Sequence, residues 1–491
     1  VYDGDAPAIY LNGESLMTVE ANSLFVDPGA TALDVQDGDL TSSIAVTGTV
    51  NTAVPGTYSL AYDVTDSAGN AAETVMRTVK VTPQPIAAIP SPVVPRLYID
   101  KNGILIDPAA IDAAKPSVTL EATPKDDSIY VSVPASVLSE FANRNADFLI
   151  EIKSPYGSYR MPVDLASRIP GLTDLLTANG LESGDIRFKL TMTDKSGDKD
   201  IQAALAASLP NGKAISPIVE YRMDIIDIRT GQAIGTADSF GKALEGMIPV
   251  TEQMTDMPDQ WGAFRYNETN GTFEFVPARA VKSGDAWVAA FRSYTDGIFA
   301  AARNPVSFSD LRNGWSEPYI RLAAAKDLVD GIGGGQYAPD KSVTRAEFAA
   351  MLVRMLGRGA SAGSAAPYDD VKRDAWYFDE VVEAKVLGLL DFAKGNRFLP
   401  GQPLTREEMA GMLASVMALE ELPMTKEYVS LDGYKDIGDV SAGYLEDVRL
   451  MVKLKIMTGV SEAEFRPQGE TTRAQAAAVF IRALRTLGMI D

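Results

Sequence analysis

Three arginines at matching positions are the residues of this chain best suited to bind a ligand. Each follows a proline at the same distance and stands directly after a threonine, in Pro339 with Thr344-Arg345, Pro400 with Thr405-Arg406 and Pro467 with Thr472-Arg473. A planar guanidinium can hold a carboxylate through two parallel hydrogen bonds. The pattern therefore indicates three sites for an acidic ligand, and such repetition also indicates a repeat architecture.

Each arginine is expected at the start of a helix, because each threonine opens a capping box. In a capping box the threonine hydroxyl accepts from the third helical N–H, and a Glu or Gln side chain accepts from the N–H of the capping residue. The pairs are Thr344 with Glu347, Thr405 with Glu408 and Thr472 with Gln475. Free N–H groups and the helix dipole favour an anion at such a helix start, so we expect them to assist the arginine.

A second helix is expected upstream of each proline, so that each repeat reads as helix, loop, helix. Apolar residues at helical spacing indicate it around Ile320, Val381 and Val448. A helix pair of this size cannot cover its own apolar face, and we expect the three repeats to pack around one core with pseudo-threefold symmetry. Three aspartates precede the prolines, and we expect them to cap the upstream helices: Asp310, Asp370 and Asp436.

Further motif residues give these repeats a family resemblance. Phe308-Ser-Asp310 is followed by Trp315, Tyr368-Asp-Asp370 by Trp376, and Tyr434-Lys-Asp436 begins the third copy. This pattern, over about 308 to 485, resembles three S-layer homology (SLH) domains. The resemblance implies a three-sided helical cell-surface anchor whose inter-repeat grooves bind secondary cell wall polysaccharide, often through a pyruvate ketal. It also implies that Arg345, Arg406 and Arg473 meet the ketal carboxylate.

The copies differ at two positions that bear on binding. The third has Gly443 and Tyr444 where the others have Trp315 and Trp376, and the second has Phe392 where the others have the loop glycines Gly331 and Gly459. We expect these glycines to allow close approach of a ligand. The first copy has Trp315, Gly331 and Arg345 together, so a groove built from it is expected to be strongest. Alternatively, the tryptophans belong to the core and each arginine marks only a stable helix start.

Composition excludes several kinds of chemistry. The chain of 491 residues contains no Cys and no His, which excludes thiol nucleophiles, disulfides, imidazole bases and Cys/His zinc sites. Its formal net charge of −21 disfavours nucleic acid. We find no leader peptide and no apolar run long enough to span a membrane, and therefore expect neither.

The N-terminal region, 1–82, has alternating strands with turn signals and resembles bacterial immunoglobulin-like modules, for which a β-sandwich is expected. Its acidic residues suggest a calcium ion at Asp37 and Asp39, or alternatively a solvated acidic surface. Residues 83–95 are rich in proline and are expected to form a stiff linker.

Strands and helices alternate between 96 and 306, which predicts a mixed α+β domain. Strands are expected at 118–122, 129–133, 148–152 and 188–192, helices at 135–143 and 172–179, and hairpin turns at 229–231 and 267–271. The region is also rich in aromatic side chains that could fill the core or stack on sugar: Trp261, Tyr266, Phe273, Phe275 and Trp287.

The sequence thus predicts a multidomain extracellular protein of the cell wall or S-layer. An Ig-like β-sandwich and a mixed α+β domain precede an all-α pseudo-threefold SLH unit formed by repeats at 307–366, 367–432 and 433–491. The expected function is non-covalent anchoring to acidic, pyruvylated wall polysaccharide, with Trp315 and Trp376 as sugar contacts. We predict no enzymatic activity and no cofactor other than calcium. The alternatives are a self-assembling lattice protein that is only tethered by the repeats, and a wall-bound glycan hydrolase.

Overall fold

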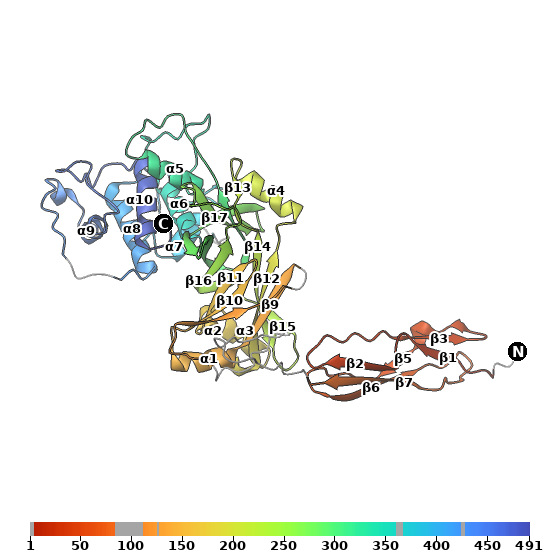
Figure 1. Ribbon diagram of the computed structural model, residues 1–491. Coiled ribbons are helices and arrows are strands. Elements are labelled where there is room, and N and C mark those ends of the chain that lie inside the picture. Colours follow the sequence, from red (N-terminus) through yellow and green to blue (C-terminus); the bar gives the residue numbers. More distant parts are fainter. Residues whose placement is uncertain (1–3, 84–110, 125–126, 360–366, 424–427) are drawn as a thin grey trace. The chain divides into compact units, whose positions relative to one another are not determined.

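The computed structural model describes residues 4–83, 111–124, 127–359, 367–423 and 428–491 (Figure 1). The chain divides into two compact units, Val1–Val94 and Pro95–Asp491. Of the expected linker, all but residue 83 lies outside the described residues.

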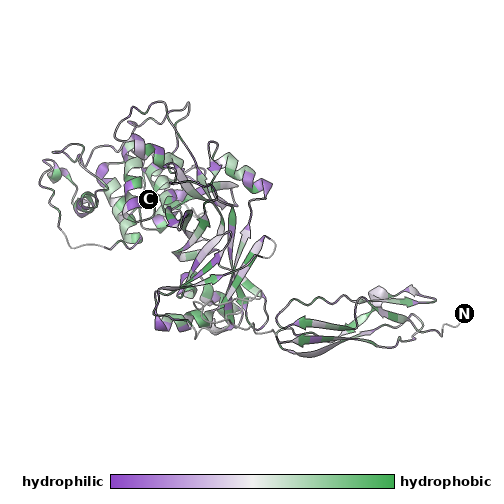
Figure 2. Cartoon of the chain, viewed as in Figure 1, coloured by the Kyte–Doolittle hydropathy of each residue, from purple (hydrophilic) through white to green (hydrophobic). Residues whose placement is uncertain are grey.

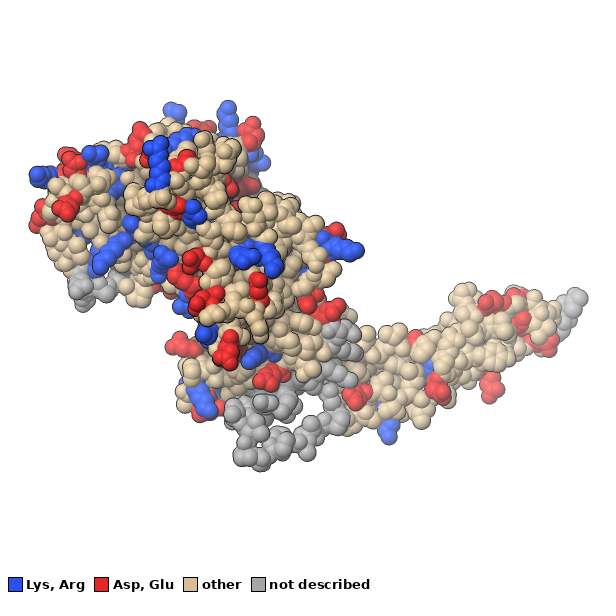
Figure 3. Space-filling view, turned by 45° about the horizontal axis from the view of Figure 1, so that its top comes forward, with Lys and Arg blue, Asp and Glu red and all other residues tan. Residues whose placement is uncertain are grey.

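The N-terminal unit consists of Ig-like strands in two sheets. One has the order β1 (Ala8–Leu11), β3 (Ala30–Asp34), β4 (Gly38–Asp39), and the other β2 (Leu16–Glu20), β7 (Val75–Thr82), β6 (Gly56–Asp63), β5 (Ala45–Thr47). Burial alternates along β6, where Leu60 and Tyr62 point into the core. The face of this unit seen in Figure 3 carries mostly acidic side chains among its charged residues.

The middle domain contains two larger sheets. The six-stranded sheet has the order β19 (Ala278–Ser283), β20 (Ala286–Thr295), β16 (Ser239–Pro249), β11 (Gly157–Pro162), β10 (Leu149–Ser154), β8 (Ser117–Glu121). The main path of the eight-stranded sheet is β18 (Thr272–Val276), β17 (Trp261–Asn267), β21 (Gly297–Arg303), β14 (Val219–Asp227), β12 (Ile186–Asp194), β9 (Ser128–Pro134). Two short strands extend it, since β13 (Lys213–Ala214) pairs with β21 and β15 (Ala233–Thr236) with β14.

Four helices accompany these sheets: α1 (Ala135–Arg144), α2 (Leu165–Arg168), α3 (Leu172–Ala178) and α4 (Lys199–Ser208). Leu138 and Phe141 of α1 belong to the main core of the domain, while Ile201 and Leu205 of α4 pack with Phe264 in a smaller cluster. The expected strands and helices of this region are confirmed, as are both hairpins, which join β14 to β15 and β17 to β18.

The C-terminal region is helical. Repeat 1 contains α5 (Glu317–Ala325) and α6 (Arg345–Leu356), repeat 2 contains α7 (Phe378–Val386) and α8 (Arg406–Leu419), and repeat 3 contains α9 (Leu445–Lys453) and α10 (Arg473–Thr486). Figure 2 shows many apolar residues along these helices. A single core cluster contains residues from all three repeats, including Phe348 of α6 and Phe480 of α10, whose rings stack 4.9 Å apart.

Backbone hydrogen bonds connect the repeats in a closed order. Arg345 N donates to Gln402 O (2.9 Å) and Ala346 N to Pro400 O (3.1 Å), so that α6 begins against the proline loop of repeat 2. The same two bonds connect α8 to the loop of repeat 3 and α10 to the loop of repeat 1: Arg406 N to Gly469 O, Glu407 N to Pro467 O, Arg473 N to Lys341 O and Ala474 N to Pro339 O. Each motif proline therefore accepts a hydrogen bond from the helix of another repeat.

The three motif aspartates do not cap the upstream helices, contrary to expectation. The carboxylate of Asp310 accepts from Tyr337 N (2.9 Å) and Ala338 N (2.7 Å), in the loop before the motif proline. Ala338 has a φ of 57°, a strained conformation that these bonds help to hold. Burial raises the pKa of the Asp310 carboxyl, but the backbone donors outweigh it, so the pKa is lowered. Asp370 and Asp436 make the equivalent pairs of bonds.

In the part of the chain that the structure describes, no helix is long and apolar enough to cross a membrane.

Candidate binding grooves between the repeats

All three helix starts have the capping boxes that the sequence indicates. Thr344 Oγ1 accepts from Glu347 N (3.2 Å) and a Glu347 carboxylate oxygen accepts from Thr344 N (2.8 Å), with the same geometry at Thr405 with Glu408 and at Thr472 with Gln475. The first two N–H groups of each helix donate to the loop of another repeat, and the third donates to the capping threonine. The first three N–H groups of each helix are therefore occupied. The expectation that free N–H groups receive the ligand is therefore wrong, and the arginine side chains remain as the candidate anion-binding groups.

The guanidinium groups reach into the loop of the next repeat. Arg406 Nε donates to Phe465 O (2.8 Å) and Nη2 to Thr458 O (2.6 Å), while the group lies 4.7 Å from the Phe465 ring centroid. Arg406 is only 4% exposed, and burial lowers its pKa to about 10. It therefore keeps its charge at neutral pH, in a position fixed by two carbonyls and one ring.

Arg473 makes the equivalent contacts with the loop of repeat 1. Its Nε donates to Tyr337 O (2.9 Å), its Nη2 to Asp330 O, and it lies 4.5 Å from the Tyr337 ring centroid.

Arg345 differs from the other two arginines. It donates to Phe398 O (3.0 Å), but its Nε and Nη2 pair with the carboxylate of Glu408, and its guanidinium lies 5.2 Å from the ring centroid of Phe392. Both side chains of this ion pair are nearly buried. The charge of Arg345 is thus neutralised within the protein.

A groove of about 320 Å³ forms where Arg406 meets repeats 1 and 3. We call it the Arg406 groove. Trp315 of repeat 1 lines it together with Gly459 and its loop neighbours, and its remaining wall comes from α10. The α10 residues are Gln475, Ala478, Val479 and Arg482.

The strongest groove was expected to unite Trp315, Gly331 and Arg345, but the structure assigns these residues to different places. Trp315 lies in the Arg406 groove, Gly331 lies in the loop that Arg473 contacts, and Arg345 reaches the loop of repeat 2. In the Arg406 groove an arginine, a loop and a tryptophan from three repeats combine, and we take this arrangement as the rule for the other two sites. By this rule the two departures in the motif, Phe392 and Gly443, fall in the same site, that of Arg345.

Trp315 and Trp376 are 59% and 61% exposed, so neither belongs to the core. Trp315 lies at the rim of the Arg406 groove, 6.5 Å from the ring of Tyr319. Such exposed indole rings are available to a ligand at little conformational cost.

The loop glycines are required by the loops themselves. A Cβ at Gly459 would lie 2.4 Å from Ser461 O and 2.5 Å from the Tyr434 ring, and one at Gly331 would lie 2.8 Å from Gln336 O and from the Phe308 ring. The aromatic residue that opens each motif thus packs on the glycine. This contact explains the glycines without a ligand.

Sequence reasoning missed the charges that the neighbouring repeats contribute. Arg482 lines the Arg406 groove, where its Nε donates to Tyr319 Oη (3.3 Å) and its Nη1 to Ile456 O (3.3 Å). The equivalent residue in α6 is Arg354, which pairs with Asp330 (3.5 Å) and Glu380 (3.7 Å), and in α8 it is Ser415. The charge of the residue that completes each capping box also varies. Gln475 is neutral, whereas Glu347 and Glu408 are acidic.

The calcium candidates in the N-terminal unit have protein partners. Both carboxylate oxygens of Asp37 accept from Ser67, and Asp39 Oδ1 accepts from Thr41 N (2.9 Å). Among the described residues, no group of three or more acidic side chains is arranged to hold a metal ion. Calcium binding here stays a prediction.

Two domain families match this chain. The "Bacterial surface protein, Ig-like domain" model matches residues 9–81, and the "S-layer homology domain" model matches residues 307–349, 367–410 and 433–477. The protein is therefore a modular extracellular protein of the cell wall or S-layer. It carries an N-terminal bacterial surface Ig-like domain and three SLH domains.

Similar proteins include both enzymes and S-layer proteins. The amylopullulanase of Thermoanaerobacterium thermosulfurigenes is 27% identical over 65% of this chain and 17% of that protein. Exoglucanase XynX of Acetivibrio thermocellus is 32% identical over 36% of this chain and 16% of that protein. The S-layer protein of Bacillus thuringiensis subsp. finitimus is 26% identical over 37% of this chain and 22% of that protein.

The prediction that the protein is not an enzyme is contradicted by these relatives, since two of them are named as glycan-degrading enzymes. The chain spans less than a fifth of the length of either enzyme. The shared part of the exoglucanase, 178 residues, is close to the length of the repeat region, whereas the amylopullulanase match of 325 residues is longer than that region.

Proposed function

We propose that the three SLH domains form a pseudo-threefold helical unit that anchors the protein by binding acidic secondary cell wall polysaccharide in grooves between repeats. The Arg406 groove is the principal site. The observation that carries this proposal is the charge of that groove, whose lining holds two arginines and no acidic residue.

The closed order of hydrogen bonds supports the pseudo-threefold arrangement. Each of α6, α8 and α10 begins against the proline loop of the following repeat, and the third returns to the first. Three bridges between strand-like segments repeat the same order: Thr344 with Pro403, Thr405 with Glu470 and Ser342 with Thr472. Equivalent contacts in a closed ring are what a threefold axis would generate.

The electrostatics of the Arg406 groove favour an anionic ligand. Within the described residues, neither Arg406 nor Arg482 has an ion pair with a carboxylate, although Arg406 is almost fully buried. Burial lowers the pKa of Arg406 and the charge of Asp436 opposes that shift, but only from beyond ion-pair distance. A buried cation without a directly paired carboxylate is costly, and a ligand carboxylate would supply that partner in surroundings of low dielectric constant. A pyruvate ketal on a wall sugar provides such a group.

Trp315 and, at the Arg473 site, Trp376 supply flat apolar surfaces for sugar rings. The apolar C–H face of a sugar can rest on an indole ring while its hydroxyl groups remain at the solvent side. Gly331 and Gly459 shape the loops below these rings. By the same arrangement the Arg473 site would combine its arginine with Gly331 and Trp376. Arg354, however, is there paired with Asp330 and Glu380, so we propose it as a weaker site for the same polymer. Sites on one polymer also reinforce one another by avidity.

Cosedimentation with purified walls tests the proposal. The full chain is expected to sediment with walls that carry ketal-linked pyruvate and to remain largely in solution with the same walls after mild acid removal of pyruvate. Reacetylated walls treated in parallel provide a control for damage to the glycan. Equal sedimentation with both walls would refute the acidic ligand.

A second candidate function is the wall attachment of a glycan-degrading enzyme. The amylopullulanase match is longer than the three repeats, so it includes part of the middle domain. We propose that the middle domain and the repeats together form a shared attachment region in such proteins. Release of reducing sugar from soluble starch and pullulan by the full protein, free and wall-bound, would test whether activity accompanies attachment.

Assembly into a surface lattice is compatible with either function, and the similarity to S-layer proteins favours it. Electron microscopy of the purified protein with and without calcium would detect ordered sheets. Only monomers under both conditions would favour simple anchoring.

A further inference from the structure

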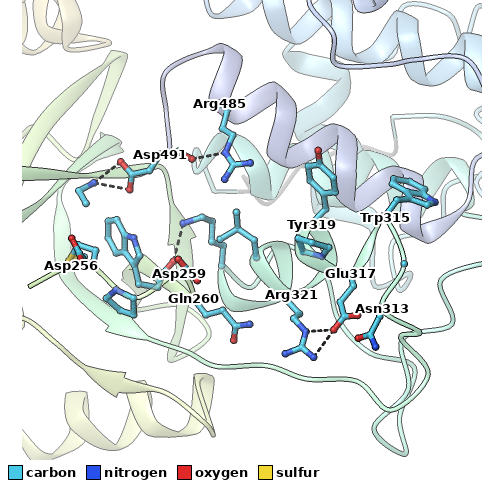
Figure 4. A pocket seen from close by; sticks show the side chains of 18 of the residues that line it. Asp256, Asp259, Gln260, Asn313, Trp315, Glu317, Tyr319, Arg321, Arg485 and Asp491 are labelled. Carbon is cyan, nitrogen blue, oxygen red and sulfur yellow. Dashed lines mark hydrogen bonds and ion pairs between the residues drawn. The ribbon is translucent and has the colours of Figure 1, made fainter. Parts of the chain in front are cut away.

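A second and larger hollow lies where the middle domain meets repeat 1 (Figure 4). We call it the junction pocket. It has a volume of about 1280 Å³ and is lined by Trp261 and Trp287 of the middle domain, by Trp315 and Tyr319 of repeat 1, and by Arg485 near the end of α10. Trp315 lines both this pocket and the Arg406 groove. The two hollows therefore share one exposed indole ring.

We infer that the junction pocket is a second saccharide subsite, continuous with the Arg406 groove across Trp315, and that it takes uncharged sugar residues of the same wall polymer. This inference rests on the proposed function of the Arg406 groove.

The charges of the junction pocket distinguish it from the groove. Its lining mixes both signs: Arg321, Lys326 and Arg485 with Asp256, Asp259, Glu317 and Asp491. Two of these residues neutralise each other, since Arg321 pairs with Glu317 at 2.7 Å. An acidic sugar would meet the remaining carboxylates, whereas the hydroxyl groups of a neutral sugar can donate to carboxylates and accept from guanidinium groups. Mixed charges of this kind therefore favour an uncharged polar ligand.

Aromatic side chains give the junction pocket the apolar surfaces that sugar rings need. Trp315 is largely exposed, and Trp287 and Tyr319 are half-buried. Trp287 Nε1 donates to Thr255 O (3.3 Å) and its ring lies 5.5 Å from Lys282 Nζ, so the indole is held in place. Trp287 belongs to the aromatic-rich stretch for which the sequence allowed two roles, core packing or sugar stacking.

The walls of the junction pocket are fixed by direct bonds between the middle domain and the repeats. Lys326, only 3% exposed, donates from Nζ to Trp261 O (2.9 Å). Asn304 Nδ2 donates to Ala325 O (3.1 Å), and the carboxylate of Asp491 accepts from Ala280 N (3.0 Å). A preformed pocket binds without the cost of ordering its walls. A polymer anchored in the Arg406 groove would thus gain affinity by continuing over Trp315.

Titration of the full chain with wall-polysaccharide fragments of one repeat unit and of three or more units tests this inference. Trp287→Ala is expected to lower affinity for the long fragment about threefold to tenfold and to leave affinity for the short fragment unchanged. Asp259→Asn, at an exposed position, should act in the same direction with less risk to folding. Tyr10→Ala removes an exposed aromatic side chain of the N-terminal unit and serves as the control.

Three outcomes are distinguishable. If Arg406→Ala weakens binding of both fragments while Trp287→Ala and Asp259→Asn leave the long fragment unaffected, the junction subsite is refuted and the groove stands. If Arg406→Ala weakens neither fragment, the proposed function itself fails. If Trp287→Ala weakens both fragments equally, or Trp287→Phe does not restore binding of the long fragment, the indole has no subsite role and the inference is overturned.

Discussion

The Arg406 groove and the Arg345 site begin from the same motif but differ in what the other repeats add. Arg406 meets the neutral Gln475, the second cation Arg482 and the exposed Trp315. Arg345 is instead paired with Glu408 and lies on the ring of Phe392. Among the described residues, the identical arginine thus has no paired carboxylate at one site and has one at the other. The comparison teaches that the neighbouring repeats, rather than the motif, decide the charge that surrounds each arginine, and under the proposed function this charge sets the binding capacity of each site.

The Arg473 site lies between these two extremes. It has the loop glycine Gly331 and carbonyl partners like those of Arg406, but its second arginine, Arg354, pairs with Asp330 and Glu380. We therefore rank the sites as Arg406 first, Arg473 second and Arg345 third.

The largest expected effect is that of Arg406→Ala compared with Arg345→Ala. Loss of Arg406 should weaken wall binding at least tenfold, because it removes the only buried cation of the groove that lacks a partner carboxylate among the described residues. Loss of Arg345 should weaken it about twofold or less. Cosedimentation at several protein concentrations measures both.

Arg406→Ala also leaves Phe465 O and Thr458 O without their donor, at a cost of about 1–3 kcal/mol each. Thermal unfolding must therefore accompany the binding measurement, and Arg406→Lys, which keeps the charge without the planar fork, should bind at an intermediate level. Equal losses from Arg345→Ala and Arg406→Ala in folded protein would abolish the ranking.

Gln475→Glu is expected to have the next largest effect, a loss of wall binding of about threefold to tenfold. A glutamate here would place a carboxylate beside Arg406, as Glu408 does beside Arg345. Stability should not fall, because glutamate forms the same capping box at the other two helix starts and would add a carboxylate beside the buried Arg406. Undiminished binding at low and high salt would show that the net charge of the groove does not select the ligand.

Glu408→Gln is the converse exchange and should produce a smaller gain. It removes the partner carboxylate of Arg345. The capping box of α8 should persist, because a glutamine, Gln475, forms the same capping box at the start of α10. In the background of Arg406→Ala, we expect it to restore wall binding about twofold to threefold, since Phe392 and the missing tryptophan still disfavour this site. No recovery would show that those two departures alone inactivate the Arg345 site.

Asp327→Asn tests a further difference between the repeats, the residue at one left-handed position, through its effect on the free energy of unfolding. Asp327, Gly388 and Lys455 occupy equivalent left-handed positions, with φ of 57°, 73° and 55°. Burial, with a further contribution from Asp330, raises the pKa of Asp327 to about 7. Folding favours the protonated carboxyl of Asp327. The stability that this carboxyl contributes to the folded protein is therefore fully present below about pH 4 and is lost as the pH rises through 7.

Asp327→Asn should therefore leave the unfolding free energy unchanged near pH 4 and raise it by roughly 1–3 kcal/mol above pH 7. Asparagine is a suitable replacement because it tolerates the left-handed conformation. Chemical unfolding at pH 4 and pH 8 measures the difference. The same gain at both pH values would exclude the buried charge as the cause.

Much of the local structure followed from the sequence. The paired threonine and glutamate or glutamine residues indicated where α6, α8 and α10 begin, and alternating apolar residues indicated strands such as β9 and β12. These features depend on residues a few positions apart. The role of Asp310 could not be read in this way, because its partners, Tyr337 and Ala338, are distant in the sequence.

The sequence by itself determined that three similar helix starts each present an arginine, because a capping box and its helix are formed by adjacent residues. Only the tertiary structure decided which loop, which capping residue and which tryptophan meet each arginine. Packing around the shared core carries each arginine to the loop of the following repeat, so Trp315 meets Arg406 rather than Arg345. The same packing against the middle domain created the junction pocket, to which residues of the middle domain, repeat 1 and repeat 3 contribute.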